Sequence, residues 1–320
     1  MTTSGVYSFS VTRDDLIRQS MLNIGKLGAY DTPDAVQTAD IGLMLNMMCK
    51  QWMGKADFAP GLKVWTRKRG HLFLSNTTGQ YTVGPGATGW TNSYTGRTLA
   101  AAAAAAATSL VLNSITGLVI GDKIGIELDS GELFWTTVLT LPSTTITIAT
   151  GLPSGASATN VVFTYTTTAQ QPLFIEAAVL RDIWSVDTPI RIFKTTQEYD
   201  ILPNKTDVTN MQDPTSIYYE NQLGNSYLYT DGGAAQDVTK HLVLTYMEPI
   251  QDLINPLDTP SYPQEWFLPL SWGLSKLICP MFNRIWTPLM QENFITSLRI
   301  AQQKDAEFSS LFFVANAEEP

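Results

Sequence analysis

Alternation between apolar and polar residues predicts an antiparallel β-meander in the second half of the chain. Aromatic and β-branched side chains, which fit a half-buried pleated surface, dominate three short runs. These runs are 216–220, 227–229 and 241–246. Gly224 and the pair Gly232-Gly233 supply turns between them, because glycine adopts positive φ angles at no steric cost. We expect the helices before and after the meander to pack on its apolar face.

Apolar positions three to five residues apart predict two helices near the N-terminus. The first spans 12–29, where Thr12 and Asp15 form a capping box and Gly28 ends the helix. The second spans 33–54, and its apolar face is marked by Val36, Ala39, Leu43, Met47 and Trp52. The short link between the two helices favours an antiparallel hairpin.

Two further helices are predicted toward the C-terminus. One follows Pro263, and Pro280 kinks or ends it. Its stripe is Leu270, Leu274, Leu277 and Ile278. The other has Thr287 as its cap and Pro288 at its first position. Its apolar face carries Met290, Phe294, Leu298 and Ala301.

Short apolar runs predict the remaining strands of this core. They are 62–66, 71–75, 80–83, 174–182 and 189–193, and the pattern of 174–182 also fits a helix. Arg67-Lys68-Arg69-Gly70 is interpreted as a charged turn between the first two runs, and 197–200 as part of a loop.

The composition changes over residues 86–165, and a separate all-β domain is expected there. The run Ala100–Ala107 is too short for a stable isolated helix, so it is either a packed short helix or extended. Strands are predicted at 124–128, 133–139, 144–149 and 161–165. A loop tolerates such an insertion because added length costs little closure entropy.

The predicted fold class is therefore α+β. An N-terminal helical hairpin and C-terminal helices pack around an antiparallel β-meander, and an all-β domain is inserted. The expected domains are a core of 1–85 with 166–320, and the insert 86–165.

Charge, cysteine content and the length of apolar runs disfavour several classes of protein. Of 320 residues 15% are charged, and the formal net charge is −9, which disfavours gripping nucleic acid through its phosphates. Cys49 and Cys279 lie far apart in helical patterns and are interpreted as core residues. No apolar run approaches the ~18 residues of a membrane span, and the N-terminus lacks the pattern of a secretory signal.

No catalytic, cofactor or metal site is predicted. The glycine motif over 84–89 is interpreted as a linker, because no helix pattern follows to hold a pyrophosphate. His71 and His241 are interpreted as ordinary sheet residues. Two of Glu127, Asp129 and Glu132 could serve as the acid and the nucleophile or base of a glycosidase. Carboxylates around a turn are more often solvated, so catalysis is not expected here.

Several phrases resemble the head-to-tail adaptor proteins of short-tailed bacteriophages, the connector or tail tubular A-like family. In the first half they are Arg13-Asp14-Asp15-Leu16-Ile17, Leu45-Asn46-Met47-Met48, Leu62-Lys63-Val64-Trp65 and Tyr81-Thr82-Val83-Gly84. In the second half they are Asp187-Thr188-Pro189-Ile190, Glu198-Tyr199, Ile217-Tyr218-Tyr219-Glu220, Tyr227-Leu228-Tyr229 and Tyr262-Pro263-Gln264-Glu265-Trp266. They cover most of 12–85 and 170–285, and the insert departs from the minimal adaptor.

The resemblance implies a non-enzymatic structural protein of the virion, made in the host cytoplasm and placed at the head–tail junction. A homo-oligomeric ring, usually of twelve copies, would join the portal protein to the tail nozzle and fibre proteins. DNA would pass through its channel during ejection without specific binding. Another tail-tube or nozzle protein is the alternative, and a polysaccharide-binding or polysaccharide-degrading tail component is a third.

A cluster of large apolar residues after the last helix is the candidate interface with the portal. It comprises Phe308, Leu311, Phe312, Phe313 and Val314. A chain end normally frays and has little reason to carry such side chains. They either fold back onto the core or, as the resemblance implies, dock into a groove of the portal.

Overall fold

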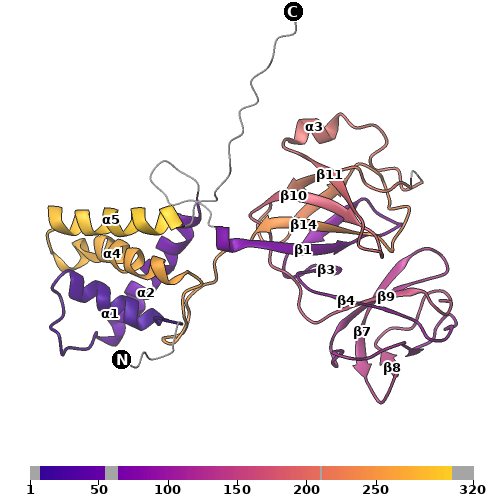
Figure 1. The fold of residues 1–320 in the computed structure, drawn as a ribbon, viewed down its shortest axis with the longest axis horizontal. Helices are drawn as coiled ribbons and strands as arrows, with labels where there is room; N and C mark the ends of the chain where they lie inside the picture. The colour runs from indigo at the N-terminus through magenta and orange to yellow at the C-terminus, as the bar shows by residue number, and fades with distance from the viewer. Residues whose placement is uncertain (1–7, 55–63, 210, 305–320) are drawn as a thin grey trace, which may run out of the picture. The chain divides into compact units, whose positions relative to one another are not determined.

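A computed structural model describes residues 8–54, 64–209 and 211–304 of the chain (Figure 1). The chain forms two compact units. The helical unit comprises residues up to Thr66 and from Ile250 onward, and the β unit comprises Arg67–Pro249. The described residues contain five α-helices and two large sheets, so the predicted α+β class is confirmed.

The helical unit contains the helices predicted at both ends of the chain. They are α1 (Arg13–Asn23), α2 (Ala35–Met53), α4 (Phe267–Ile278) and α5 (Pro288–Lys304), with short 3₁₀ turns at Val64–Thr66, Gln264–Trp266 and Pro280–Phe282. The capping box is present, and the Asp15 amide donates to the Thr12 hydroxyl at 3.2 Å. α1 ends at Asn23 rather than near Gly28, because Gly25 adopts a φ of +66° and turns the chain.

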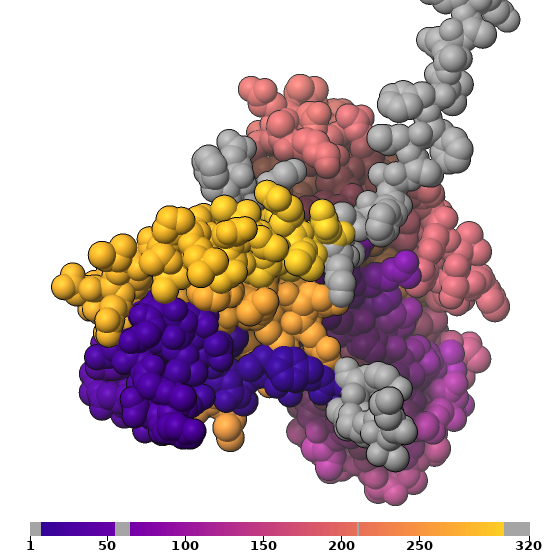
Figure 2. Space-filling model, turned by 60° about the vertical axis from the view of Figure 1, so that its left-hand side comes forward, coloured from indigo at the N-terminus to yellow at the C-terminus, as the bar shows by residue number. Residues whose placement is uncertain are grey.

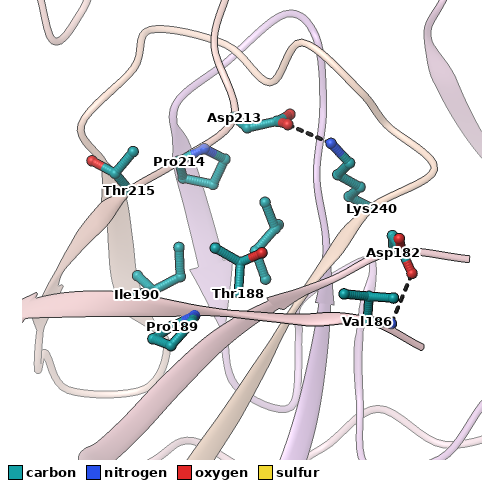
Figure 3. A pocket seen from close by; sticks show the side chains of 10 residues that line it. Asp182, Val186, Thr188, Pro189, Ile190, Asp213, Pro214, Thr215 and Lys240 are labelled. Carbon is teal, nitrogen blue, oxygen red and sulfur yellow. Dashed lines mark hydrogen bonds and ion pairs between the residues drawn. The ribbon is translucent and has the colours of Figure 1, made fainter. Parts of the chain in front are cut away.

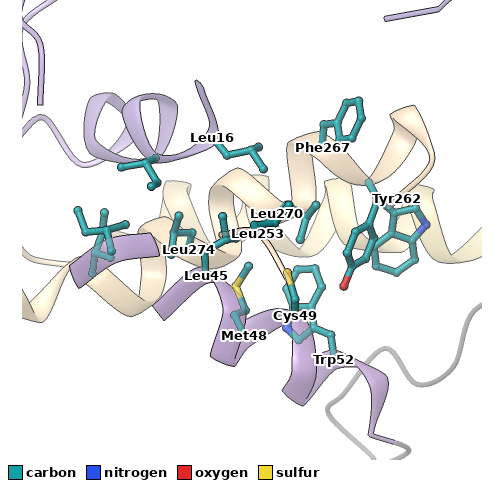
Figure 4. Close-up of a cluster of buried hydrophobic side chains, with 14 of the residues drawn as sticks. Leu16, Leu45, Met48, Cys49, Trp52, Leu253, Tyr262, Phe267, Leu270 and Leu274 are labelled. Carbon is teal, nitrogen blue, oxygen red and sulfur yellow. The ribbon is translucent and has the colours of Figure 1, made fainter. Parts of the chain in front are cut away.

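One apolar core holds the helical unit together, and Figure 4 shows part of it. Figure 2 shows one face of this unit, where α5 (yellow) lies along α4 (orange) beside the indigo N-terminal helices. The indole rings of Trp52 and Trp266 meet edge to face in the core, with centroids 6.0 Å apart. The core cluster contains no residue of a described strand. The prediction that the helices pack on the meander is therefore wrong, because their own apolar stripes close a core.

The larger sheet of the β unit has eight strands, in the order β2-β13-β12-β11-β10-β14-β1-β3. Figure 1 labels β11, β10, β14, β1 and β3, which follow one another in this order. Their bounds are β1 (Arg67–Phe73), β2 (Gln80–Val83), β3 (Trp90–Thr91), β10 (Phe174–Arg181), β11 (Asp187–Phe193), β12 (Ser216–Glu220), β13 (Ser226–Thr230) and β14 (His241–Met247). All neighbours are antiparallel except β11 and β12.

The predicted three-stranded meander is wrong in one respect. β12 and β13 form the expected hairpin, but β14 leaves them and lies between β10 and β1. Every β14 residue except Thr245 is buried. A strand that is apolar on both faces is most stable in the middle of a sheet. Its continuous apolar run therefore places it in the centre rather than beside β13.

The smaller sheet of the β unit has six strands, in the order β4-β9-β6-β7-β8-β5. Their bounds are β4 (Thr95–Thr98), β5 (Ser109–Val111), β6 (Lys123–Glu127), β7 (Leu133–Thr140), β8 (Thr145–Ile148) and β9 (Val161–Tyr165). The four predicted strands correspond to β6–β9, and two more were not predicted. The alanine run is not helical, since Ala103 bridges to Ala156 and Ala106 has a φ of +64°.

The strand predicted at 62–66 is wrong over its described part, because Val64–Thr66 form a 3₁₀ turn. Two other local predictions are also wrong. The stretch 67–70 lies inside β1 rather than in a turn, and the Trp90 ring covers Gly70 so closely that a Cβ there would come within 2.0 Å of it. The stretch 197–200 belongs to the short helix α3 (Thr196–Asp200), whose N-cap Thr195 accepts the Glu198 amide. In both places a tertiary or capping contact outweighs the local pattern.

The two sheets meet at an aromatic cluster, here called the sheet junction. Its buried members are Phe73, Leu133, Phe163 and Val238, and Tyr94 and Trp135 pack against them. The rings of Phe73 and Phe163 are 4.5 Å apart between centroids. β1 and β9, which belong to different sheets, therefore share one apolar contact.

Candidate interaction surfaces

The predicted portal-docking residues lie outside the described part of the chain. Phe308, Leu311, Phe312, Phe313 and Val314 all follow Lys304, where the description of α5 stops. Docking of this segment therefore stays a prediction.

α2 carries apolar side chains on two faces. Ile41, Leu45 and Met48 are buried in the core of the helical unit. Of the face predicted to be buried, Trp52 is in the core, but Val36 is 68% exposed, Leu43 63% and Met47 56%. Spacings of seven and four residues place these three side chains on one line along the helix. We call this line the outer face of α2.

Both apolar faces of α2 are visible in the sequence pattern, but the periodicity alone does not show which face is buried. The core selects Ile41 and its neighbours because they meet α4, where Gly273 lets Trp52 and Met48 approach the helix backbone. A helix that is apolar on opposite sides is typical of one that is covered on both. The outer face is therefore a candidate interface.

The hairpin between β10 and β11 presents a second apolar surface, here called the hairpin tip and formed by Ile183, Trp184 and Val186. Their side chains are 50%, 80% and 61% exposed. The backbone amides of Trp184 and Val186 donate to Asp182 Oδ1 at 2.8 and 2.9 Å. The tip is thus fixed by its own turn while its apolar side chains face solvent.

An ion pair closes the base of this hairpin. Arg181 Nε donates to Asp187 Oδ1 at 2.7 Å, and its Nη2 donates to Oδ2 at 2.8 Å. The hydrogen bond from Arg181 holds the pKa of Asp187 below its usual value. A two-pronged pair of this kind fixes geometry better than a single contact.

A pocket of about 240 Å³ lies beside the tip (Figure 3). Its apolar lining residues are Leu180, Val186, Pro189, Ile190 and Pro214. Lys240 Nζ donates to Asp213 Oδ2 at 2.5 Å across its polar side, and this bond raises the pKa of Lys240. Asp213 Oδ1 is buried and has no hydrogen-bond partner among the described residues.

A pair of histidines lies beside the sheet junction. The rings of His71 and His241 are 5.3 Å apart between centroids, and Tyr94 packs on both. Burial lowers the pKa of His71 to about 4 and that of His241 to about 3, with Arg181 adding to both effects. Both rings are therefore neutral near pH 7, so neither histidine is in the protonated form that a general acid requires.

Two of the three carboxylates considered for glycoside hydrolysis hold backbone in place. The Val161 amide donates to Glu127 Oε2 at 2.8 Å, and the Ser157 amide donates to Asp129 Oδ1 at 2.9 Å. The Ser157 bond is the main cause that lowers the pKa of Asp129. Glu132 accepts the Leu128 amide through its own backbone carbonyl. This arrangement favours a structural role for the group.

The cysteines, the glycine motif and the metal-binding residue types were the remaining candidates for a chemical site. Cys49 and Cys279 are buried free thiols, as predicted. Over residues 84–89 the chain turns and continues into β3 rather than into a helix. Within residues 8–54, 64–209 and 211–304, His, Cys, Asp and Glu side chains form no group of three able to hold a metal ion. None of the helices in the same residues combines the length and apolar character needed to cross a membrane.

No known family model matches the chain, and no curated protein matches its sequence. Sequence reasoning missed the hairpin tip, although Trp184 between Asp182 and Asp187 was a usable signal. A tryptophan in a short connection between two strands lies at the surface and has few neighbours to bury it.

Proposed function

We propose that the protein is a structural component of a bacteriophage virion, a ring-forming head-to-tail adaptor between the portal and the tail. The observation that carries the proposal is the exposed outer face of α2. Symmetric oligomers bury such a face against the next copy. The adaptor-like phrases in the sequence support the same function.

The outer face suits a repeated contact between copies. Val36, Leu43 and Met47 are aliphatic or thioether side chains, and interfaces between subunits are enriched in such groups at their centres. A ring repeats each contact, so a modest gain per copy accumulates around the assembly. Another tail-tube or nozzle protein would use the same face, and its position in a virion separates the two functions.

We also propose that residues 86–165 form an inserted domain in an adaptor core, which begins with a helical hairpin. The support is that the segments entering and leaving the six-stranded sheet bond to each other. The Gly89 amide donates to the Tyr165 hydroxyl at 2.9 Å, and the Thr91 hydroxyl donates to the Thr167 carbonyl at 2.7 Å. A module whose two ends lie together can be inserted into a loop without displacing its host.

The ring is tested by assembly on purified portal, measured by mass photometry. Leu43→Glu with Met47→Glu is expected to abolish assembly, because it would bury charges in the interface. The matched control is Leu223→Glu, since Leu223 is fully exposed on the β12–β13 turn. If the outer-face variant assembles like wild type, the interface assignment is wrong. Absence of the protein from purified virions would refute the adaptor function itself.

A further inference from the structure

The hairpin tip and the neighbouring pocket form one surface. Val186 belongs to both, because it follows Trp184 at the tip and also lines the pocket (Figure 3). Asp182 also lines the pocket while it holds the tip through two backbone amides. A ligand seated in the pocket would therefore touch the tip.

The tip is prepared for binding. The turn over 183–186 is fixed by Asp182 and by the Arg181–Asp187 pair. Binding a ligand would therefore cost little backbone conformational entropy. Trp184 is 80% exposed, and tryptophan is among the residues most enriched at the centres of binding surfaces. Such a side chain on a rigid turn can act as an anchor.

The pocket specifies the chemistry of the ligand. Asp213 lines the pocket and keeps 31% of its side-chain surface exposed beside Lys240. Asp182, Asp213 and Asp237 outnumber Lys240, whose Nζ also lies 3.8 Å from Asp237 Oδ2. The surplus of negative charge favours a cationic donor, and the aliphatic walls favour an apolar side chain beside it.

We propose that the hairpin tip and this pocket bind a segment of another protein, which places an apolar side chain against Trp184 and a Lys or Arg side chain toward Asp213. This inference stands without the proposed adaptor function. A sugar fits less well, because Ile183, Val186 and Pro189 would leave its hydroxyl groups without partners. A second copy fits less well, because its own pocket beside the tip carries the same surplus of carboxylates.

A peptide selection tests this inference on the full chain. A random dodecapeptide display library is selected against the protein, and recovered peptides are resynthesised with a fluorescein label. Fluorescence polarisation then compares each peptide with a copy in which citrulline replaces arginine, or norleucine replaces lysine. Peptides that combine apolar and basic residues are expected to be enriched.

The variants separate the two halves of the surface. Trp184→Ala is expected to weaken every selected peptide about tenfold or more. Asp213→Asn is expected to remove the preference for the charged peptide over its neutral copy. Leu223→Ala truncates a fully exposed side chain on another hairpin and is expected to leave the affinity of every peptide unchanged. Thermal melts check that each variant is folded, and Ile183→Ser replaces Asp213→Asn as the second variant if the latter is not.

Three results would overturn the proposal. The first is a selection that yields no binder, and the second is a set of binders that Trp184→Ala leaves intact. The third is a concentration-dependent dimer that Trp184→Ala abolishes, since the occupant would then be a second copy of this chain. Failure of ring assembly on the portal would leave these measurements unaffected.

Discussion

The two sheets of the β unit are built from the chain in opposite ways. All six strands of the smaller sheet come from the continuous stretch 95–165, and its apolar cluster uses only residues of that stretch. The eight-stranded sheet places β1 beside β14, although about 170 residues separate them in the chain. The smaller sheet therefore depends on local contacts, and the larger one on contacts that close long loops.

The largest expected effect comes from removing the smaller sheet. Joining 93 to 164 with a Gly/Ser link should leave a core that unfolds cooperatively, because Trp90 and β3 remain in place. The predicted boundary at 86 is less favourable, since it also removes Trp90, which is fully buried against Gly70 and Tyr246. Deletion of 87–164 should therefore lose roughly 3–5 kcal/mol more of the free energy of unfolding.

Urea denaturation of the two deletions measures this difference. The stretch 94–167 expressed alone is the counterpart, and it should also unfold cooperatively because its cluster is self-contained. If the deletion that retains Trp90 is insoluble or unfolds without a transition, the larger sheet depends on the smaller one. The contrast between the two sheets would then be wrong.

The same contrast explains how far the sequence could predict the fold. β6–β9 follow alternating patterns with local turns, so their positions were predictable. β14 was recognised as a strand, but its neighbours β10 and β1 are set by tertiary packing that periodicity does not contain. Among the surfaces, the outer face of α2 was visible as apolar positions, yet its exposure depends on how α4 packs on the opposite side. Pattern reasoning finds elements, whereas packing decides which face is free.

A smaller effect is expected from acidification at the sheet junction. The folded-state pKa values of about 4 for His71 and about 3 for His241 lie below the ordinary value of 6.5. Below about pH 6.5 the unfolded chain binds more protons than the folded one, so the free energy of unfolding falls as the pH falls toward 4 and 3. Above pH 6.5 this contribution is fully present. The loss should reach a few kcal/mol.

Urea midpoints at about pH 7.5 and about pH 5 measure the effect. His241→Phe keeps an aromatic ring that cannot be protonated, and it should lose part of the pH dependence. Arg69, Arg181 and Asp187 also act on this pair, so Arg69→Gln serves as a control for the surrounding charge. An unchanged pH slope in His241→Phe would show that other groups cause the acid sensitivity.

The smallest expected effect concerns Glu127, where a structural and a catalytic interpretation make different predictions. Its Oε2 atom accepts the Val161 amide at 2.8 Å, which ties the end of β6 to the start of β9 in the smaller sheet. Glu127→Ala should lower the free energy of unfolding by about 1 kcal/mol, the typical worth of one hydrogen bond. Glu127→Gln retains an acceptor oxygen and should cost less. If Glu127 is instead a catalytic acid or nucleophile, Glu127→Gln should abolish activity although it preserves the fold, because an amide cannot transfer a proton or attack a sugar. Urea denaturation of both variants, together with an assay for reducing sugar released from host capsule, separates the two roles. Release of sugar by wild type that Glu127→Gln abolishes would establish catalysis in the smaller sheet.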